Sequence, residues 1–68
     1  MSEYTASLCE SVDGKYIRYK QVDLDALNDP EAARKADKWA AEIDPIEIRE
    51  GSWLIVKNGT RSFRPKKL

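Results

Sequence analysis

Two short dipeptides, Asp13-Gly14 and Asn58-Gly59, constrain the fold of this chain more than any other feature of its sequence. Both are residue pairs that accept a positive φ angle at the two central positions of a type I′ turn. Both also stand between runs of residues that favour strands. Each dipeptide therefore predicts a β-hairpin, one near each end of the sequence.

The Asp13-Gly14 turn sets the register of the first hairpin, pairing Val12 with Lys15 and Leu8 with Tyr19. Because side chains alternate along a strand, one face is expected to be apolar. That face holds Ala6, Leu8, Val12, Ile17 and Tyr19. The opposite face reads as solvated, and it holds Thr5, Ser7, Cys9, Ser11, Tyr16, Arg18 and Lys20.

The second hairpin, with Asn58-Gly59 as its turn, pairs Lys57 with Thr60, and it sets Trp53 opposite Arg64, where a cation–π contact can form. Its faces divide the apolar residues. One face holds Leu54, Val56 and Phe63, and the other holds Trp53 and Ile55. Four consecutive apolar residues are typical of a strand that is covered on both sides. Either the fold or a partner is therefore expected to cover the second face.

One helix is predicted between the hairpins. Asp29 is expected to be its N-cap and Pro30 its first residue, because proline lacks only an N–H that would be unbonded there. Apolar residues recur at helical spacing: Ala32, Ala36, Trp39, Ala40 and Ile43. Asp44-Pro45 ends the helix, since a residue before proline is disfavoured in the α region. Residues 23–28 could form an extra helical turn upstream, with Leu24 and Leu27 meeting the core.

Residues 46–49 alternate between apolar and charged side chains, which predicts a further short strand before the second hairpin. The expected order is β-β-α-β-β-β, an α+β fold in which two β-hairpins flank one central helix packed on an antiparallel sheet. At 68 residues, the sequence has room for one small domain over 1–68. Its last few residues are expected to fray after Pro65.

The sequence offers few covalent means of stabilising so small a domain. It has one cysteine, Cys9, and no histidine, so it cannot form an internal disulfide. Self-association to a homodimer is the expected alternative. The lone thiol, together with the lack of an apolar run suited to export or membrane insertion, predicts a cytoplasmic protein without membrane contact.

The sequence contains few residues that are suited to catalysis, and we expect no enzyme. Histidine, the usual general base near neutral pH, is missing, and no glycine-rich phosphate loop occurs. We expect Cys9 to be an incidental surface or edge cysteine without a role as a nucleophile, although Arg18, its predicted cross-strand partner, would slightly lower the pKa of the thiol. The acidic residues near the helix start match no calcium loop. We therefore predict no catalytic residues, no metal, no cofactor and no small-molecule substrate.

The leading functional hypothesis is a non-enzymatic protein-interaction module that uses an exposed sheet face or edge. The doubly apolar strand and the small size favour it. A polar strip with one aromatic on the outer face of the first hairpin could meet the same partner. The residues expected to bind the partner are Trp53, Ile55, Tyr16 and Arg18.

The alternative hypothesis is a small nucleic-acid-binding accessory protein. Residues 1–48 carry eleven acidic and six basic side chains, whereas residues 49–68 carry one acidic and six basic, so the positive charge gathers in the C-terminal hairpin and tail. The expected phosphate-binding residues are Lys57, Arg61, Arg64, Lys66 and Lys67. This hypothesis requires that acidic residues from the helix start do not neutralise those cations.

Overall fold

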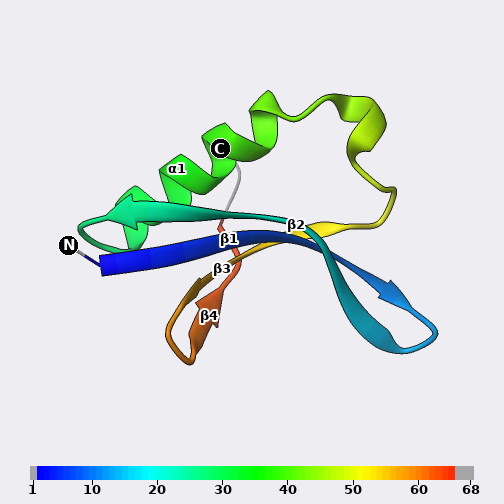
Figure 1. Ribbon diagram of the computed structural model, residues 1–68, viewed down its shortest axis with the longest axis horizontal. Coiled ribbons are helices and arrows are strands. Elements are labelled where there is room, and N and C mark those ends of the chain that lie inside the picture. The colour runs from blue at the N-terminus through cyan, green and yellow to red at the C-terminus, as the bar shows by residue number, and fades with distance from the viewer. Residues whose placement is uncertain (1, 66–68) are drawn as a thin grey trace.

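Residues 2–65 form a four-stranded antiparallel sheet with one helix packed on one of its faces, as the computed structural model describes them (Figure 1). The elements, in chain order, are β1 (Ser2–Val12), β2 (Lys15–Ala26), α1 (Asp29–Glu42), the 3₁₀ turn η1 (Pro45–Glu47), β3 (Trp53–Asn58) and β4 (Arg61–Phe63). The strand order is β2-β1-β3-β4. The predicted α+β fold of two hairpins around a central helix is confirmed. Among the described residues, no helix has the length and apolarity needed to span a membrane.

The first hairpin turns at Asp13-Gly14 as predicted, with φ angles of 52° and 78° that fit a type I′ turn. Its register holds as far as the pairing of Cys9 with Arg18. A bulge then shifts the ladder, so Leu8 faces Lys20, and the predicted pairing of Leu8 with Tyr19 is wrong. Strand β2 also continues to Ala26, so the helical turn predicted at 23–28 does not form.

The expectation that the outer face of β1 is solvated is wrong for Ser7 and Cys9, which are both buried. The reason is the strand order, because β1 lies between β2 and β3 and is flanked by side chains from both. Conversely, Val12 and Ile17 are exposed although they were expected to face the core. The tip of the β1–β2 hairpin extends beyond the helix (Figure 1), which leaves the two residues uncovered.

The second hairpin forms at the expected place but in a different register. Asn58 pairs with Arg61, which leaves Gly59 and Thr60 as the two turn residues. Gly59 has a φ of 64°, the sign that a type II′ turn requires at its first central position. The predicted pairings of Lys57 with Thr60 and of Trp53 with Arg64 are therefore wrong. Because the shift is two residues, the faces are unchanged, and Leu54, Val56 and Phe63 all lie on the core side.

The helix begins at Asp29, one residue earlier than predicted. Asn28, and not Asp29, is the N-cap, and its side chain accepts a hydrogen bond of 3.0 Å from the backbone N–H of Glu31. Asp29 becomes the first helical residue, and its carboxylate is free for other contacts. The strand predicted at 46–49 is wrong, because Asp44 caps the turn η1 and leaves Ile46 90 % exposed. The observed order is thus β-β-α-β-β.

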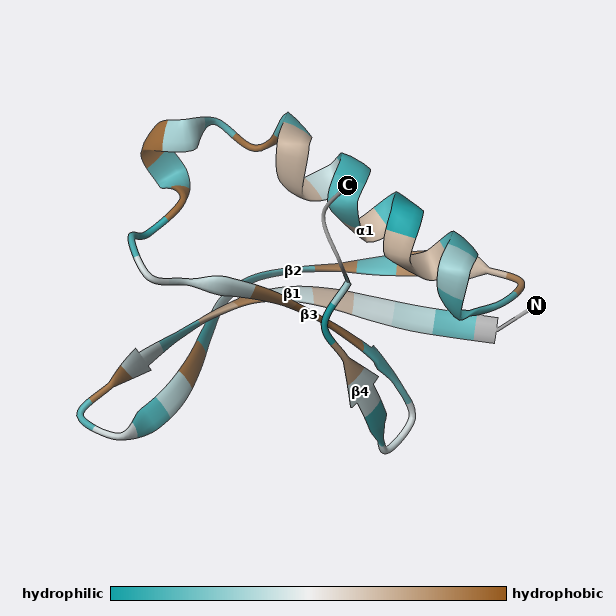
Figure 2. Ribbon diagram, turned by 180° about the vertical axis from the view of Figure 1, so that it is seen from behind, coloured by the Kyte–Doolittle hydropathy of each residue, from teal (hydrophilic) through white to brown (hydrophobic). Residues whose placement is uncertain are grey.

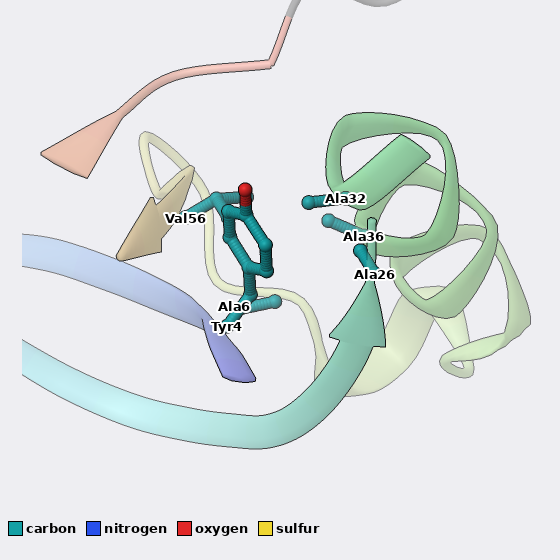
Figure 3. Packing of buried hydrophobic residues seen from close by; sticks show 6 residues of the cluster. All are labelled: Tyr4, Ala6, Ala26, Ala32, Ala36 and Val56. Atoms are coloured by element: carbon teal, nitrogen blue, oxygen red, sulfur yellow. The ribbon is translucent and has the colours of Figure 1, made fainter. Parts of the chain in front are cut away.

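Alanines build the interface between helix and sheet. Ala32 and Ala36 are fully buried and let α1 approach the strands closely (Figure 3). They meet a cluster from three strands: Tyr4, Ala6, Ala26 and Val56. Figure 2 shows hydrophilic residues along the outer side of α1 and hydrophobic stretches in the strands beneath it. The side chains at the rim of this core are Val22, Leu24, Trp39, Leu54 and Phe63.

Tyr4, Asp29 and Arg61 join three elements at one end of the core. The Tyr4 hydroxyl donates to Asp29 Oδ1 at 2.9 Å, and Arg61 Nη2 donates to the same oxygen at 2.7 Å. The guanidinium of Arg61 and the Tyr4 hydroxyl hold the pKa of Asp29 below its ordinary value. Burial and the nearby Asp29 carboxylate raise the pKa of Tyr4.

This network predicts that stability falls at both extremes of pH. The folded-state pKa of Asp29 is depressed, so its contribution is complete above the ordinary value of 3.8 and is lost as the pH falls through the folded-state pKa. The pKa of Tyr4 is raised, so its contribution is complete below 10.0 and is lost as the pH rises through the folded-state pKa. Urea unfolding as a function of pH measures both. Asp29→Asn should flatten the acid limb, and an acid limb identical to that of the wild type would contradict this assignment.

Candidate functional site

The face of the sheet opposite α1, here called the outer face, carries a hollow of about 280 Å³. Strands β1, β2 and β3 each contribute to it, because Cys9 of β1 lies between Arg18 and Trp53. Figure 1 shows the tips of both hairpins bending away from the helix on this side. The lining residues, which define the Trp53 hollow, are Cys9, Tyr16, Arg18, Trp53, Ile55, Lys57 and Arg64.

Two side chains hold the Trp53 ring. Tyr16 meets it edge to face, with ring centroids 5.4 Å apart and an interplanar angle of 87°. The guanidinium carbon of Arg64 lies 5.0 Å from the centroid of the Trp53 ring, so the predicted cation–π contact is present although the two residues are not cross-strand partners. Tyr16 itself is 78 % exposed. The hollow therefore combines a fixed indole with an accessible phenol ring.

The charges in the Trp53 hollow are all positive. Arg18, Lys57 and Arg64 line it, and no carboxylate does. Elsewhere in the described chain, four cations form ion pairs with acidic side chains: Lys20, Lys35, Arg49 and Arg61. Within residues 2–65, no ion pair joins the three cations of the hollow to a carboxylate. An anionic group entering the hollow would meet unopposed positive charge.

Cys9 lies at the base of the hollow and is only 5 % exposed. Burial raises the pKa of its thiol, and the surrounding cations Arg18, Lys57 and Arg64 oppose that effect only in part. The thiol is thus held in its protonated, weakly nucleophilic form. This arrangement argues against covalent chemistry at Cys9.

We expect the native protein to react with a disulfide reagent such as DTNB at least ~10-fold more slowly than the urea-unfolded chain, because burial both blocks access and suppresses the thiolate. The release of thionitrobenzoate at pH 8 measures both rates. Equal rates in the native and unfolded states would show that Cys9 is accessible.

The structure brings together all four residues expected to bind a protein partner, since Tyr16, Arg18, Trp53 and Ile55 line the same hollow. The residues expected to bind nucleic acid are divided. Lys57 and Arg64 join the hollow, whereas Arg61 pairs with Asp29 at the helix start. Lys66 and Lys67 lie outside the described residues. Sequence reasoning missed Cys9 as a lining residue, although alternation places it on the same face.

Two further hollows differ in character. One, of about 270 Å³, lies beside the helix and includes Asp37, Ile48 and Pro65 in its lining. The other, of about 240 Å³, is acidic and is lined by Glu3, Asp23, Leu24 and Asp25. Over the part of the chain that is described, no group of three or more His, Cys, Asp or Glu side chains is placed to hold a metal ion.

Comparison with protein-family models, curated proteins and solved structures gives no match for this chain.

Proposed function

We propose that the protein is a non-enzymatic interaction module that binds a protein partner in the Trp53 hollow. The observation that carries this proposal is the convergence of Tyr16, Arg18, Trp53 and Ile55 on one concave surface. Trp, Tyr and Arg are the residue types that dominate binding energy at protein interfaces. The unopposed cations favour a partner segment that presents carboxylates together with an apolar or aromatic side chain.

The test compares two double variants as immobilised baits for a cell extract. Tyr16→Ala with Trp53→Ala removes both rings of the hollow. Leu27→Ala with Ile46→Ala removes two exposed apolar side chains elsewhere and serves as the control. Quantitative mass spectrometry of retained proteins should show a partner that is lost with the first pair and kept with the second. A retained set that is the same for both pairs contradicts the proposal, provided that thermal unfolding shows both variants to be folded.

The second candidate function, binding of single-stranded nucleic acid, is favoured by one observation. The hollow sets the exposed Tyr16 ring among three unpaired cations, and exposed aromatics with nearby cations bind bases and phosphates. Pairing of Arg61 with Asp29 weakens this reading, because it removes a cation on which the hypothesis relied.

Fluorescence anisotropy of a labelled oligonucleotide tests the second candidate. Three phosphate contacts to a single strand predict that log K falls against log salt with a slope of about −2. Lys57→Glu should abolish such binding, whereas Lys38→Glu on the exposed side of α1 should lower it far less. No change in anisotropy at low salt would exclude the function.

The cytoplasm is the compartment that we propose for this module. A single free thiol such as Cys9 is typical of a reducing environment. The slow reaction expected of Cys9 would further protect it from oxidation.

A further inference from the structure

Strand β2 is an edge of the sheet, and it is long. It covers Lys15–Ala26, and in the described part of the chain its only strand neighbour is β1. An edge strand offers backbone N–H and C=O groups that can pair with a strand of another chain. The opposite edge, β4, has only three residues and offers much less.

The backbone of β2 shows which residues direct their N–H and C=O groups toward the free edge. Lys35 Nζ donates to the backbone carbonyl of Asp25, so the carbonyl of Asp25 points away from β1. Backbone direction alternates along an antiparallel pair, so Asp23 and Gln21 point the same way. Arg18 also points away from β1. Its partner on β1, Cys9, lies two positions from Ser7, and Ser7 is the partner of Gln21. Lys35 closes only the far end of this edge.

The charges along this edge are self-complementary. Arg18 lies opposite Cys9 and Asp23 lies opposite Thr5, each two positions along β1 from the Ser7–Gln21 pair. A two-fold axis perpendicular to the sheet and passing beside Gln21 would therefore set Arg18 of one copy opposite Asp23 of a second copy. Symmetry repeats this ion pair on the other side of the axis. Without the bulge, the two side chains would not lie at equal distances from Gln21.

The same axis also matches apolar residues on the helix side of the sheet. Ile17 and Leu24 lie opposite Glu10 and Tyr4, at equal distances from the Ser7–Gln21 pair along β1. Pairing of two β2 strands would set Ile17 against Leu24 of the second copy. Ile17 is exposed in the single chain although it lies on the apolar face. A second copy would cover it, and cross-strand apolar and charged pairs both stabilise such a ladder.

We propose that two copies of this chain form a homodimer by antiparallel pairing of their β2 strands about Gln21. The product is one continuous eight-stranded sheet with both helices on one face. Both Trp53 hollows then open on the other face. Because Arg18 is opposed by Asp23 of the second copy, Lys57 and Arg64 are the cations of each hollow left to meet an acidic partner segment, and the dimer can engage a partner at two points. This proposal rests on the proposed function of the protein as an interaction module. The occupant of the free β2 edge is a second copy of the chain.

Charge reversal tests the pairing. Sedimentation equilibrium of the wild type should give twice the 7.8 kDa mass of the chain. Arg18→Asp or Asp23→Arg alone sets like charges opposite each other at two places and should weaken dimerisation about 10- to 100-fold. The double variant Arg18→Asp with Asp23→Arg restores both ion pairs and should recover the dimer. A wild-type mass of one chain at all concentrations overturns the proposal, as does a double variant that stays monomeric.

A control and a second readout separate this proposal from the function of the Trp53 hollow. Glu42→Arg reverses an exposed charge on α1, away from β2, and should leave the dissociation constant of the dimer unchanged. Asp23 does not line the hollow, so Asp23→Arg baits should retain the partner that depends on Tyr16 and Trp53. A dimer that survives Asp23→Arg but is lost with Tyr16→Ala and Trp53→Ala would overturn the edge pairing and assign self-association to the hollow.

Discussion

Replacing Ala36 with aspartate is expected to remove much or all of the stability of the fold at 25 °C. Ala36 is 0 % exposed and faces the sheet, so a carboxylate there would lose its water without gaining a partner. That penalty exceeds about 4 kcal/mol. A domain of this length has roughly 3–10 kcal/mol of stability in total. Far-UV circular dichroism and amide dispersion in NMR spectra report the loss of structure.

Ala41→Asp is the matched control for Ala36→Asp, because it places the same carboxylate on the exposed side of the same helix. Its cost should be about 1–1.5 kcal/mol, from helix propensity and an unfavourable position near the helix C-terminus. If Ala36→Asp unfolded cooperatively at the urea midpoint of Ala41→Asp, the helix would not pack on the sheet through this residue.

Val56→Ala is the second substitution with a large expected effect. Val56 is 0 % exposed and is the largest fully buried side chain of the described core. Its truncation removes two methyl groups and leaves a cavity between β3 and the helix, at a cost of about 2–3 kcal/mol. The urea midpoint should fall while the slope of the unfolding free energy against urea stays unchanged. Ile46→Ala, at a site 90 % exposed, should cost less than about 0.5 kcal/mol.

Local signals in the sequence were sufficient to predict the type and order of most elements. The Asp13-Gly14 turn fixed the near end of the first hairpin, and the alanine spacing fixed the helix face. Both signals depend only on residues that are close together in the sequence. The bulge at Leu8 and Cys9 has no such local signal. Side-chain alternation alone therefore could not predict the bulge.

Two errors arose where one local signal has two readings. Asn58-Gly59 fits a type I′ turn and Gly59-Thr60 fits a type II′ turn, and the two differ by two residues in register. Asp44-Pro45 marks the end of the helix, but an acidic residue before proline is also a start signal. Here it starts the 3₁₀ turn η1, which overrides the alternation of residues 46–49.

The candidate site was predicted in composition but not in shape. Alternation placed Tyr16 and Arg18 on one outer face, and Trp53 and Ile55 on another. Only the pairing of β1 with β3 makes these the same face, and no local pattern reveals that pairing. Arg61 lies apart from Lys57 and Arg64 for a reason that the sequence does contain. Arg61 and Arg64 are three positions apart in the sequence, so strand alternation already places the two on opposite faces.

The central place of β1 in the sheet also has a consequence for how the chain folds. Its contacts with β2 close across a two-residue turn, whereas its contacts with β3 join residues as far apart in sequence as Thr5 and Lys57. Such distant pairings are slow to form, so the first hairpin is expected to exist before the sheet does. During synthesis, β1 must therefore wait for β3 to emerge, and the backbone edge of β1 that later pairs with β3 is meanwhile open to any strand or chaperone that reaches it first.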